Sequence, residues 1–263
     1  MESPWLFFKD VYIISLKTEM ERRKNFTKLL EERDCTNYKI INAVNGKKHP
    51  TLKQYFIKTG VINEDINISP GGLGCLASHK LVWDMAYYSI DSTEPFWILI
   101  FEDDFSFHPL ISNNLFLEYI RNMPADAKFV KFGHHMIAEG YNHYKPANKY
   151  WLNMGRMRSY GTYCYAVHSD ILPSLCAFKN FKEAIDCVSF NTGFYGAVDP
   201  EIVLEVPREP QMNWILYDDP YTGNKQEYRG IVGCNPHQSA TFDPCIIQQK
   251  ILEYLKQQNN KST

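Results

Sequence analysis

The sequence has little of what marks an exported, membrane-embedded or nucleic-acid-binding protein. Among its 263 residues, no apolar run approaches the length that spans a bilayer. The N-terminus has no basic region followed by a long apolar core, so we expect no signal peptide. A formal net charge of -2 argues against broad nucleic-acid binding. We therefore expect a cytoplasmic protein without a membrane span, and peripheral association with a membrane stays open.

The sequence also lacks paired cysteines. Its 7 cysteines are scattered, and none forms a Cys-x-x-Cys pair, which argues against a zinc cluster. An odd number of cysteines without a signal peptide indicates reduced thiols, as in the cytosol. Internal repeats and obvious linkers are absent too, so we expect residues 1–263 to form a single domain.

The most informative stretch runs from Phe96 to Phe105. Six apolar residues lead directly into Glu102, Asp103 and Asp104, and Phe105 follows. Such an apolar run is typical of a strand buried on both faces. The three carboxylates should lie where this strand ends, since ligands bind at the carboxyl ends of strands in open α/β sheets. Clustered oxygen ligands suit Mg²⁺ or Mn²⁺, although a solvated acidic turn is the simpler interpretation.

Strand-like and helix-like segments alternate along the chain. A strand at 10–16, a helix at 19–33 and a strand at 38–42 indicate a βαβ unit, and hence a parallel sheet. Residues 69–74, rich in glycine, read as a flexible turn, and 208–245 as an irregular segment. Further strands are expected at 129–133 and 202–207, and further helices at 51–60, 75–90, 112–122, 170–178 and 246–258.

Several polar residues allow both a functional and a structural interpretation. The basic cluster that begins at Arg22 is either a solvated helix face or a contact for a diphosphate. His79 is more often a structural histidine than a ligand at such a position. Asp186, a single acid in an apolar setting, is either a helix cap or a catalytic base. His134 and His135 are adjacent, so they should point apart and make a poor metal site.

Five blocks, in order, resemble glycosyltransferase family 25. Residues 12–16, followed by Glu21-Arg22-Arg23, are similar to its opening strand and basic helix start, with Ser15 where asparagine is usual. Residues 42–46 resemble its A-x-x-G block, and 74–79, with Trp83, its G-C-x-x-S-H block. Residues 99–104 resemble its L-E-D-D block. Residues 161–165 resemble its G-T-x-x-Y block, followed by Asp186 at its V-D position.

This resemblance implies a GT-A-type fold: a central, mostly parallel sheet with flanking helices, here with a loop-rich C-terminal third. It implies an inverting, metal-dependent transfer of a hexose, glucose or galactose, from a UDP-sugar to a hydroxyl of a glycan or of a hydroxylysine-like protein acceptor. The cation would be Mn²⁺ or Mg²⁺ at a DxD-like motif. The implied metal ligands are Glu102, Asp104 and His237, and the implied base is Asp186. The implied donor contacts are Leu16, Arg22, Val44, Ser78, His79 and Asp103.

Two alternatives stay open at this point. One is a nucleotidyltransferase on a similar fold, which is disfavoured because the usual glycine-rich, basic loop is absent after Leu16. The other is a non-catalytic module that binds a glycan or a partner protein. The three intact acids argue against such a module without excluding it.

Overall fold

The computed structural model describes residues 2–89, 91–136, 145–155, 161–181, 185, 193–204, 216–218 and 225–234. Two predicted site residues, Asp186 and His237, lie outside these ranges. The helix predicted at 246–258 lies outside them as well.

The core of the fold is an eight-stranded sheet with the order β2-β1-β3-β9-β5-β10-β8-β7. Six of the eight strands run in one direction, because only β9 and β8 are antiparallel to both of their neighbours. The predicted α/β architecture with a mostly parallel sheet is thus confirmed. The strands are β1 Phe8–Ser15, β2 Tyr38–Asn42, β3 Trp97–Glu102, β5 Phe129–Lys131, β7 Lys145–Pro146, β8 Trp151–Asn153, β9 Cys164–His168 and β10 Phe194–Ala197.

The first three strands in this order are parallel, so their carboxyl ends lie together along one side of the sheet, which is called its carboxyl edge below. β1 pairs in parallel with β2 on one side, where Ser15 lies opposite Asn42. It pairs in parallel with β3 on the other side, where Ile14 lies opposite Glu102. The predicted βαβ unit is therefore correct, with α1 (Met20–Glu31) as its crossover helix. Polar residues that follow these strands meet at this edge, which is where α/β proteins bind ligands.

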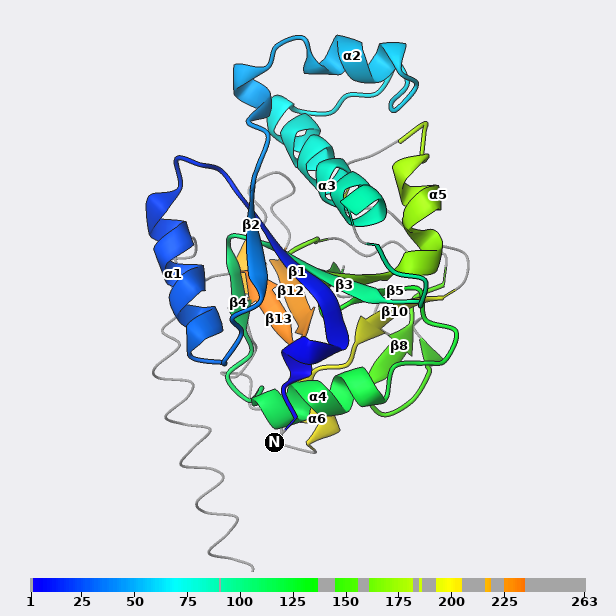
Figure 1. The fold of residues 1–263 in the computed structure, drawn as a ribbon. Coiled ribbons are helices and arrows are strands. Elements are labelled where there is room, and N and C mark those ends of the chain that lie inside the picture. The colour runs from blue at the N-terminus through cyan, green and yellow to red at the C-terminus, as the bar shows by residue number, and fades with distance from the viewer. Residues whose placement is uncertain are drawn as a thin grey trace, which may run out of the picture.

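Helices cover both faces of the sheet (Figure 1). α3 (Pro70–Ser89) and α5 (Leu172–Cys176) lie on one face, and α4 (Asn113–Arg121) and α6 (Pro200–Val203) on the other. α4 begins where the Ser112 side chain accepts a hydrogen bond from the Leu115 N–H, and it buries Phe116 against the sheet. Within the described part of the chain, no helix is both long and apolar enough to cross a membrane.

The glycine-rich residues 69–74, predicted as a flexible turn, instead form the first turn of α3. The Ser69 hydroxyl accepts a hydrogen bond from the Gly72 N–H at 3.1 Å, as an N-cap residue does. Close packing explains a glycine nearby: a Cβ at Gly46, in the short 3-10 helix Gly46–Lys48, would lie 1.7 Å from the Pro70 carbonyl oxygen. The segment after β2 therefore packs closely against the start of α3. Helix α2 (Leu52–Lys58) lies near the same end of α3 (Figure 1).

Two further sequence predictions differ from the structure. The strand predicted at 202–207 begins within helix α6, where Val203 is buried, because a short apolar run fits either element. The segment at 208–245, predicted as irregular, contains strands. β12 pairs with β6, so that His134 and His135 lie within a strand, and β13 pairs with β4. These strands are β4 Phe105–Phe107, β6 Gly133–Met136, β11 Leu216–Asp218, β12 Lys225–Gly230 and β13 Val232–Cys234.

Candidate functional site

A pocket of about 450 Å³ opens at the carboxyl edge of β1, β2 and β3. Seven predicted site residues line it, although they come from four separate parts of the chain: Leu16, Arg22, Val44, Ser78, His79, Glu102 and Asp103. Asp104 adjoins the pocket through Arg22, whose Nη1 lies 3.9 Å from its Oδ2. The structure thus brings together every predicted site residue that it describes. What each residue does there stays a prediction.

Asp103 is held from two sides. The Ser15 hydroxyl donates a hydrogen bond to its Oδ2 at 2.7 Å, and Arg22 Nη1 donates one to its Oδ1 at 3.0 Å. Burial alone would lower the pKa of Arg22, but the carboxylates of Asp103, Asp104 and Glu19 together outweigh burial and raise it. Arg22 is therefore part of the pocket wall and not simply a solvated helix position. Its Nη1 lies 3.0 Å from Asp103 Oδ1 and 3.9 Å from Asp104 Oδ2, and both Arg22 and Asp103 line the pocket.

Arg23, the next residue of the basic cluster, links the carboxyl ends of β1 and β2. Its Nη2 donates to the Ser15 carbonyl oxygen at 2.9 Å and to Asn42 Oδ1 at 2.8 Å. Its Nε donates to the Ser15 hydroxyl at 3.2 Å. The two arginines at the start of α1, Arg22 and Arg23, thus have different contacts. Arg22 faces the acids, and Arg23 fixes the ends of β1 and β2.

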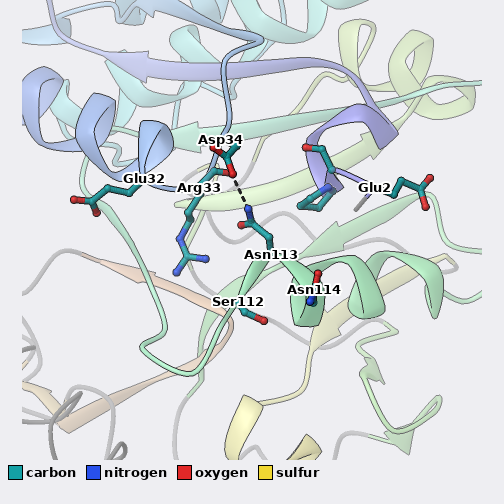
Figure 2. Close-up of a pocket in the computed structure, with 9 residues that line it drawn as sticks. Glu2, Glu32, Arg33, Asp34, Ser112, Asn113 and Asn114 are labelled. Carbon is teal, nitrogen blue, oxygen red and sulfur yellow. Dashed lines mark hydrogen bonds between the residues drawn. The ribbon is translucent and has the colours of Figure 1, made fainter.

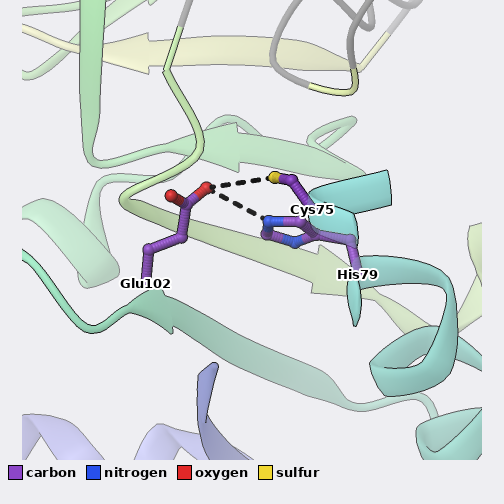
Figure 3. Close-up of side chains that lie close together, drawn as sticks. All are labelled: Cys75, His79 and Glu102. Carbon is purple, nitrogen blue, oxygen red and sulfur yellow. Dashed lines mark hydrogen bonds and ion pairs between the residues drawn. The ribbon is translucent and has the colours of Figure 1, made fainter. Parts of the chain in front are cut away.

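Glu102, the last residue of β3, receives three donors on one carboxylate oxygen. His79 Nε2 lies 3.1 Å from Oε1, and the Cys75 thiol lies 4.0 Å from it (Figure 3). The Thr162 hydroxyl donates to the same oxygen. Burial alone raises the pKa of Glu102, but its hydrogen bond and charge interaction with His79, the hydrogen bond from Thr162 and the charge of Lys131 together outweigh burial and lower it. Glu102 is therefore held ionised.

A buried polar chain stands behind His79. Its Nδ1 lies 2.7 Å from the Tyr165 hydroxyl, which accepts a hydrogen bond from Trp83 Nε1 at 3.1 Å. All three side chains are at most 1% exposed. Burial also raises the pKa of Tyr165 well above its ordinary value, so the hydroxyl keeps its proton.

Ser78 and Val44 also line the pocket, and they are hydrogen-bonded to each other. The Ser78 hydroxyl accepts from the Val44 N–H at 2.8 Å and donates to the Gly74 carbonyl oxygen at 2.6 Å. These contacts hold the segment after β2 against α3. Ser78 is 1% exposed, so it shapes the pocket mainly through the backbone that it fixes.

A second, larger pocket of about 630 Å³ lies at the amino end of β1 (Figure 2). It is lined by Glu2, Ser3, Pro4, Glu32, Arg33, Asp34, Ser112, Asn113 and Asn114. Arg33 stacks on Phe107, 4.2 Å from the ring centre, and burial lowers the pKa of Arg33 to about 10. No predicted site residue lies here, and the acids at the end of β3 are at the other edge of the sheet. We therefore place the functional site in the smaller pocket.

Sequence reasoning assigned no role to Cys75, Thr162, Tyr165 or Trp83. The signal was present, because all four belong to the G-C-x-x-S-H and G-T-x-x-Y blocks or directly follow the first of them. Cys75, His79 and Glu102 offer three donor atoms that lie within 4.8 Å of one another, a spacing that also suits a metal ion.

The fold and this site therefore define an α/β protein with an acidic ligand site at the carboxyl edge of its sheet. The model of glycosyltransferase family 25 (LPS biosynthesis protein) matches residues 8–187. The chain belongs to that family. It is also similar to a Haemophilus influenzae protein named "Putative glycosyltransferase", with 24% identity over 233 residues, which cover 88% of this chain and 80% of that protein.

Proposed function

We propose that this glycosyltransferase is an inverting, metal-dependent hexosyltransferase of the GT-A type. It moves glucose or galactose from a UDP-sugar to a hydroxyl of a glycan or of a hydroxylysine-like protein acceptor. The observation that carries the proposal is the run Glu102-Asp103-Asp104 at the end of β3, where Glu102 and Asp103 line the pocket and Arg22 lies beside Asp103 and Asp104. Residues 1–263 then act as one catalytic domain, in the cytoplasm, where the thiols stay reduced.

The acids differ in the partners that they already have, and this supports a division of roles. Both Asp103 oxygens accept hydrogen bonds, from Ser15 and Arg22, so Asp103 fixes the arginine beside the donor. Glu102 has Oε1 occupied by donors, while its other oxygen points away from Cys75 and His79 (Figure 3). Asp104 Oδ2 lies 3.9 Å from Arg22 Nη1, so Asp104 belongs to the ion pairs around this arginine.

These residues fit a divalent cation. Ionised carboxylate oxygens are the ligands that Mn²⁺ and Mg²⁺ prefer, so Glu102 and Asp104 would hold the ion, and His237 would add a third ligand. When bound, such an ion stabilises the charge that grows on a UDP leaving group. Arg22 would help to stabilise the same negative charge on UDP, because its guanidinium is fixed next to the acids.

The acceptor side of the reaction is assigned to Asp186. Inversion requires a base that takes the proton of the acceptor hydroxyl on the face opposite the leaving group. Asp186 directly follows Ile185, which is buried in the core. Asp186→Ala should abolish transfer to an acceptor while the hydrolysis of the donor by water persists. Unchanged turnover of this variant with a true acceptor would remove Asp186 as the base.

The reaction class is tested by a donor screen. The purified chain is incubated with the common UDP-sugars, in Mn²⁺ and in EDTA, and the release of UDP is measured. We expect release from UDP-glucose or UDP-galactose, and we expect EDTA to stop it. Asp104→Ala should lower the release by about 10² to 10³-fold, because one side of the leaving-group charge loses its stabilisation. Full activity of this variant would rule out the metal role of Asp104.

Calorimetry with UDP separates an enzyme from a binding module. An enzyme of this kind should bind UDP tightly only with Mn²⁺, and a glycan-binding module need not bind UDP at all. Binding of UDP that is identical in Mn²⁺ and EDTA would contradict the metal-dependent proposal.

A further inference from the structure

The chain of polar groups behind Glu102 fixes where each hydrogen lies. An indole nitrogen can only donate, so Trp83 donates its hydrogen to the Tyr165 oxygen. Tyr165 has a single hydrogen of its own, and its hydroxyl is 2.7 Å from His79 Nδ1. Within the described part of the chain, His79 Nδ1 is the only acceptor for that hydrogen. The hydroxyl must therefore donate to Nδ1, and Nε2 must carry the proton of the His79 ring.

The other arrangement leaves buried groups unsatisfied. If Nδ1 carried the proton, the Tyr165 oxygen would accept hydrogens from both His79 and Trp83. The hydroxyl hydrogen of Tyr165 would then have no acceptor among the described residues, in a fully buried site. The bare Nε2 lone pair would then face the Glu102 carboxylate at 3.1 Å. An unpaired buried donor loses its hydration without compensation, and two facing lone pairs repel each other.

We propose that Trp83, Tyr165 and His79 are positioning residues that present Glu102 to the cation of the donor site. The chain places the Nε2–H of His79 on Oε1 of Glu102, where the hydroxyl of Thr162 also donates. That oxygen is closed, and the carboxylate can turn only its second oxygen toward the pocket. The inference rests on the proposed function for its purpose, since the cation is the one assigned to Glu102 and Asp104.

The position of the hydrogen on the His79 ring also indicates the role of the group formed by Cys75, His79 and Glu102. Its three donor atoms have the spacing of a site for a thiophilic metal ion. A histidine binds a metal only through an unprotonated ring nitrogen. Both ring nitrogens of His79 are already committed, Nδ1 to the hydroxyl of Tyr165 and Nε2 to its proton. The group is therefore a hydrogen-bonded anchor for Glu102 and not a zinc site.

Nuclear magnetic resonance of the histidine ring tests this assignment without any activity. In the ¹⁵N-labelled full chain without metal, long-range proton–nitrogen couplings should show the hydrogen of the His79 ring on Nε2, with Nδ1 as an acceptor. His79→Gln identifies the signals. A ring protonated at Nδ1, or at both nitrogens, would overturn the proposal.

Tyr165→Phe tests the purpose of the chain. The variant keeps the ring that stacks on Phe129, with centroids 4.9 Å apart, and removes only the hydroxyl. Loss of an outer hydrogen bond of this kind weakens metal binding by about 10 to 100-fold, so we expect at least a tenfold rise in the Kd for Mn²⁺. The ring of His79 should no longer show a single protonated form, and binding of UDP in EDTA should stay within about twofold.

Tyr119→Phe is the matched control. Tyr119 is also fully buried and donates its hydroxyl to the Val198 carbonyl oxygen at 2.7 Å, away from the site. It should leave both the Mn²⁺ affinity and the His79 signals unchanged. Equal Mn²⁺ affinities for Tyr165→Phe and Tyr119→Phe would overturn the positioning role. If the wild-type chain bound no Mn²⁺, the metal-dependent function and the purpose of the chain would fail together, whereas the ring signals would still decide the protonation of His79.

Discussion

The two ends of β1 carry pockets of opposite character. At the carboxyl end, Glu102 and Asp103 are both held by donors that come from other parts of the chain. At the amino end, the larger pocket surrounds Arg33, whose guanidinium stacks on Phe107 and whose burial lowers its pKa to about 10. Pocket size favours the amino end, while the organisation of charge favours the carboxyl end.

The difference lies in how charge is treated at each end. At the carboxyl end, donors hold carboxylates ionised, which prepares them for a ligand of opposite charge. At the amino end, burial acts against the charge of Arg33, and the neighbouring Glu2 is paired with Arg121 on the surface. An arrangement of charges that is stabilised before any ligand arrives is the property expected of a catalytic site, and volume alone is not.

The same substitution at the two ends should have the most unequal effects. Glu102→Gln keeps the size of the side chain and removes its charge, so transfer should fall by about 10² to 10³-fold with a UDP-sugar and Mn²⁺. Glu2→Gln, at the amino-end pocket, should leave the rate within about twofold. Steady-state kinetics of the two variants measure this contrast. Equal losses would mean that the assignment of the site to the carboxyl end is wrong.

A pair of arginine variants sharpens the contrast through opposite effects. Arg22→Met should raise the KM for the donor about tenfold, because a charge-assisted contact beside the diphosphate is lost. Arg33→Met should leave that KM unchanged and raise the melting temperature, because it removes a guanidinium whose charge burial disfavours. Lys24→Met, at an exposed position of the same helix as Arg22, is the control for the loss of positive charge.

A higher KM for Lys24→Met equal to that of Arg22→Met would show that the effect is general electrostatics. A fall in melting temperature for Arg33→Met would show that stacking on Phe107 outweighs the cost of burial. Either result would weaken the contrast that we draw between the charges of the two pockets.

Much of the carboxyl end could be predicted from the sequence because its signals are local. The apolar run of β3 ends where the carboxylates begin, and the βαβ pattern fixes which strand ends meet. The family blocks then placed Arg22, Ser78 and His79 in the same site. Each of these inferences depends on neighbours along the chain or on a parallel register, which sequence periodicity reveals.

The contacts that organise the site were not predictable in the same way. The hydrogen bonds of Glu102 come from positions 23, 27 and 60 residues away, and no periodicity reports such distances. The glycines at the start of α3 suggest a flexible turn, whereas one of them, Gly74, is required by close packing: a Cβ there would lie 2.4 Å from the Val44 carbonyl oxygen. Helix α6 was misread as a strand because four residues are too few to reveal a period.

Two cysteines extend the comparison to chemical reactivity. Cys75 lines the carboxyl-end pocket, so UDP with Mn²⁺ should slow its alkylation by iodoacetamide several-fold. Cys35, near the amino-end pocket, is fully buried, and burial raises its pKa to about 12, so it should stay unreactive with or without ligand. Mass spectrometry of the peptides that contain each cysteine measures both rates. Unprotected Cys75 under saturating UDP would place the nucleotide elsewhere.

The smallest expected effect is a dependence of stability on pH at Glu102. Its pKa in the folded protein lies below the ordinary value of 4.5, so its ionised form stabilises the fold above that pH. This contribution is lost as the pH falls below 4.5 and through the lower folded pKa, where the carboxylate becomes protonated.

The melting temperature of the wild type should therefore exceed that of Glu102→Gln at neutral pH, and the gap should close as the pH falls through this window. Glu2→Gln, whose carboxylate is exposed at the other end of β1, should run parallel to the wild type throughout. A constant gap between the wild type and Glu102→Gln would mean that the donors around Oε1 do not favour the ionised form, and that the two ends of the strand treat charge alike.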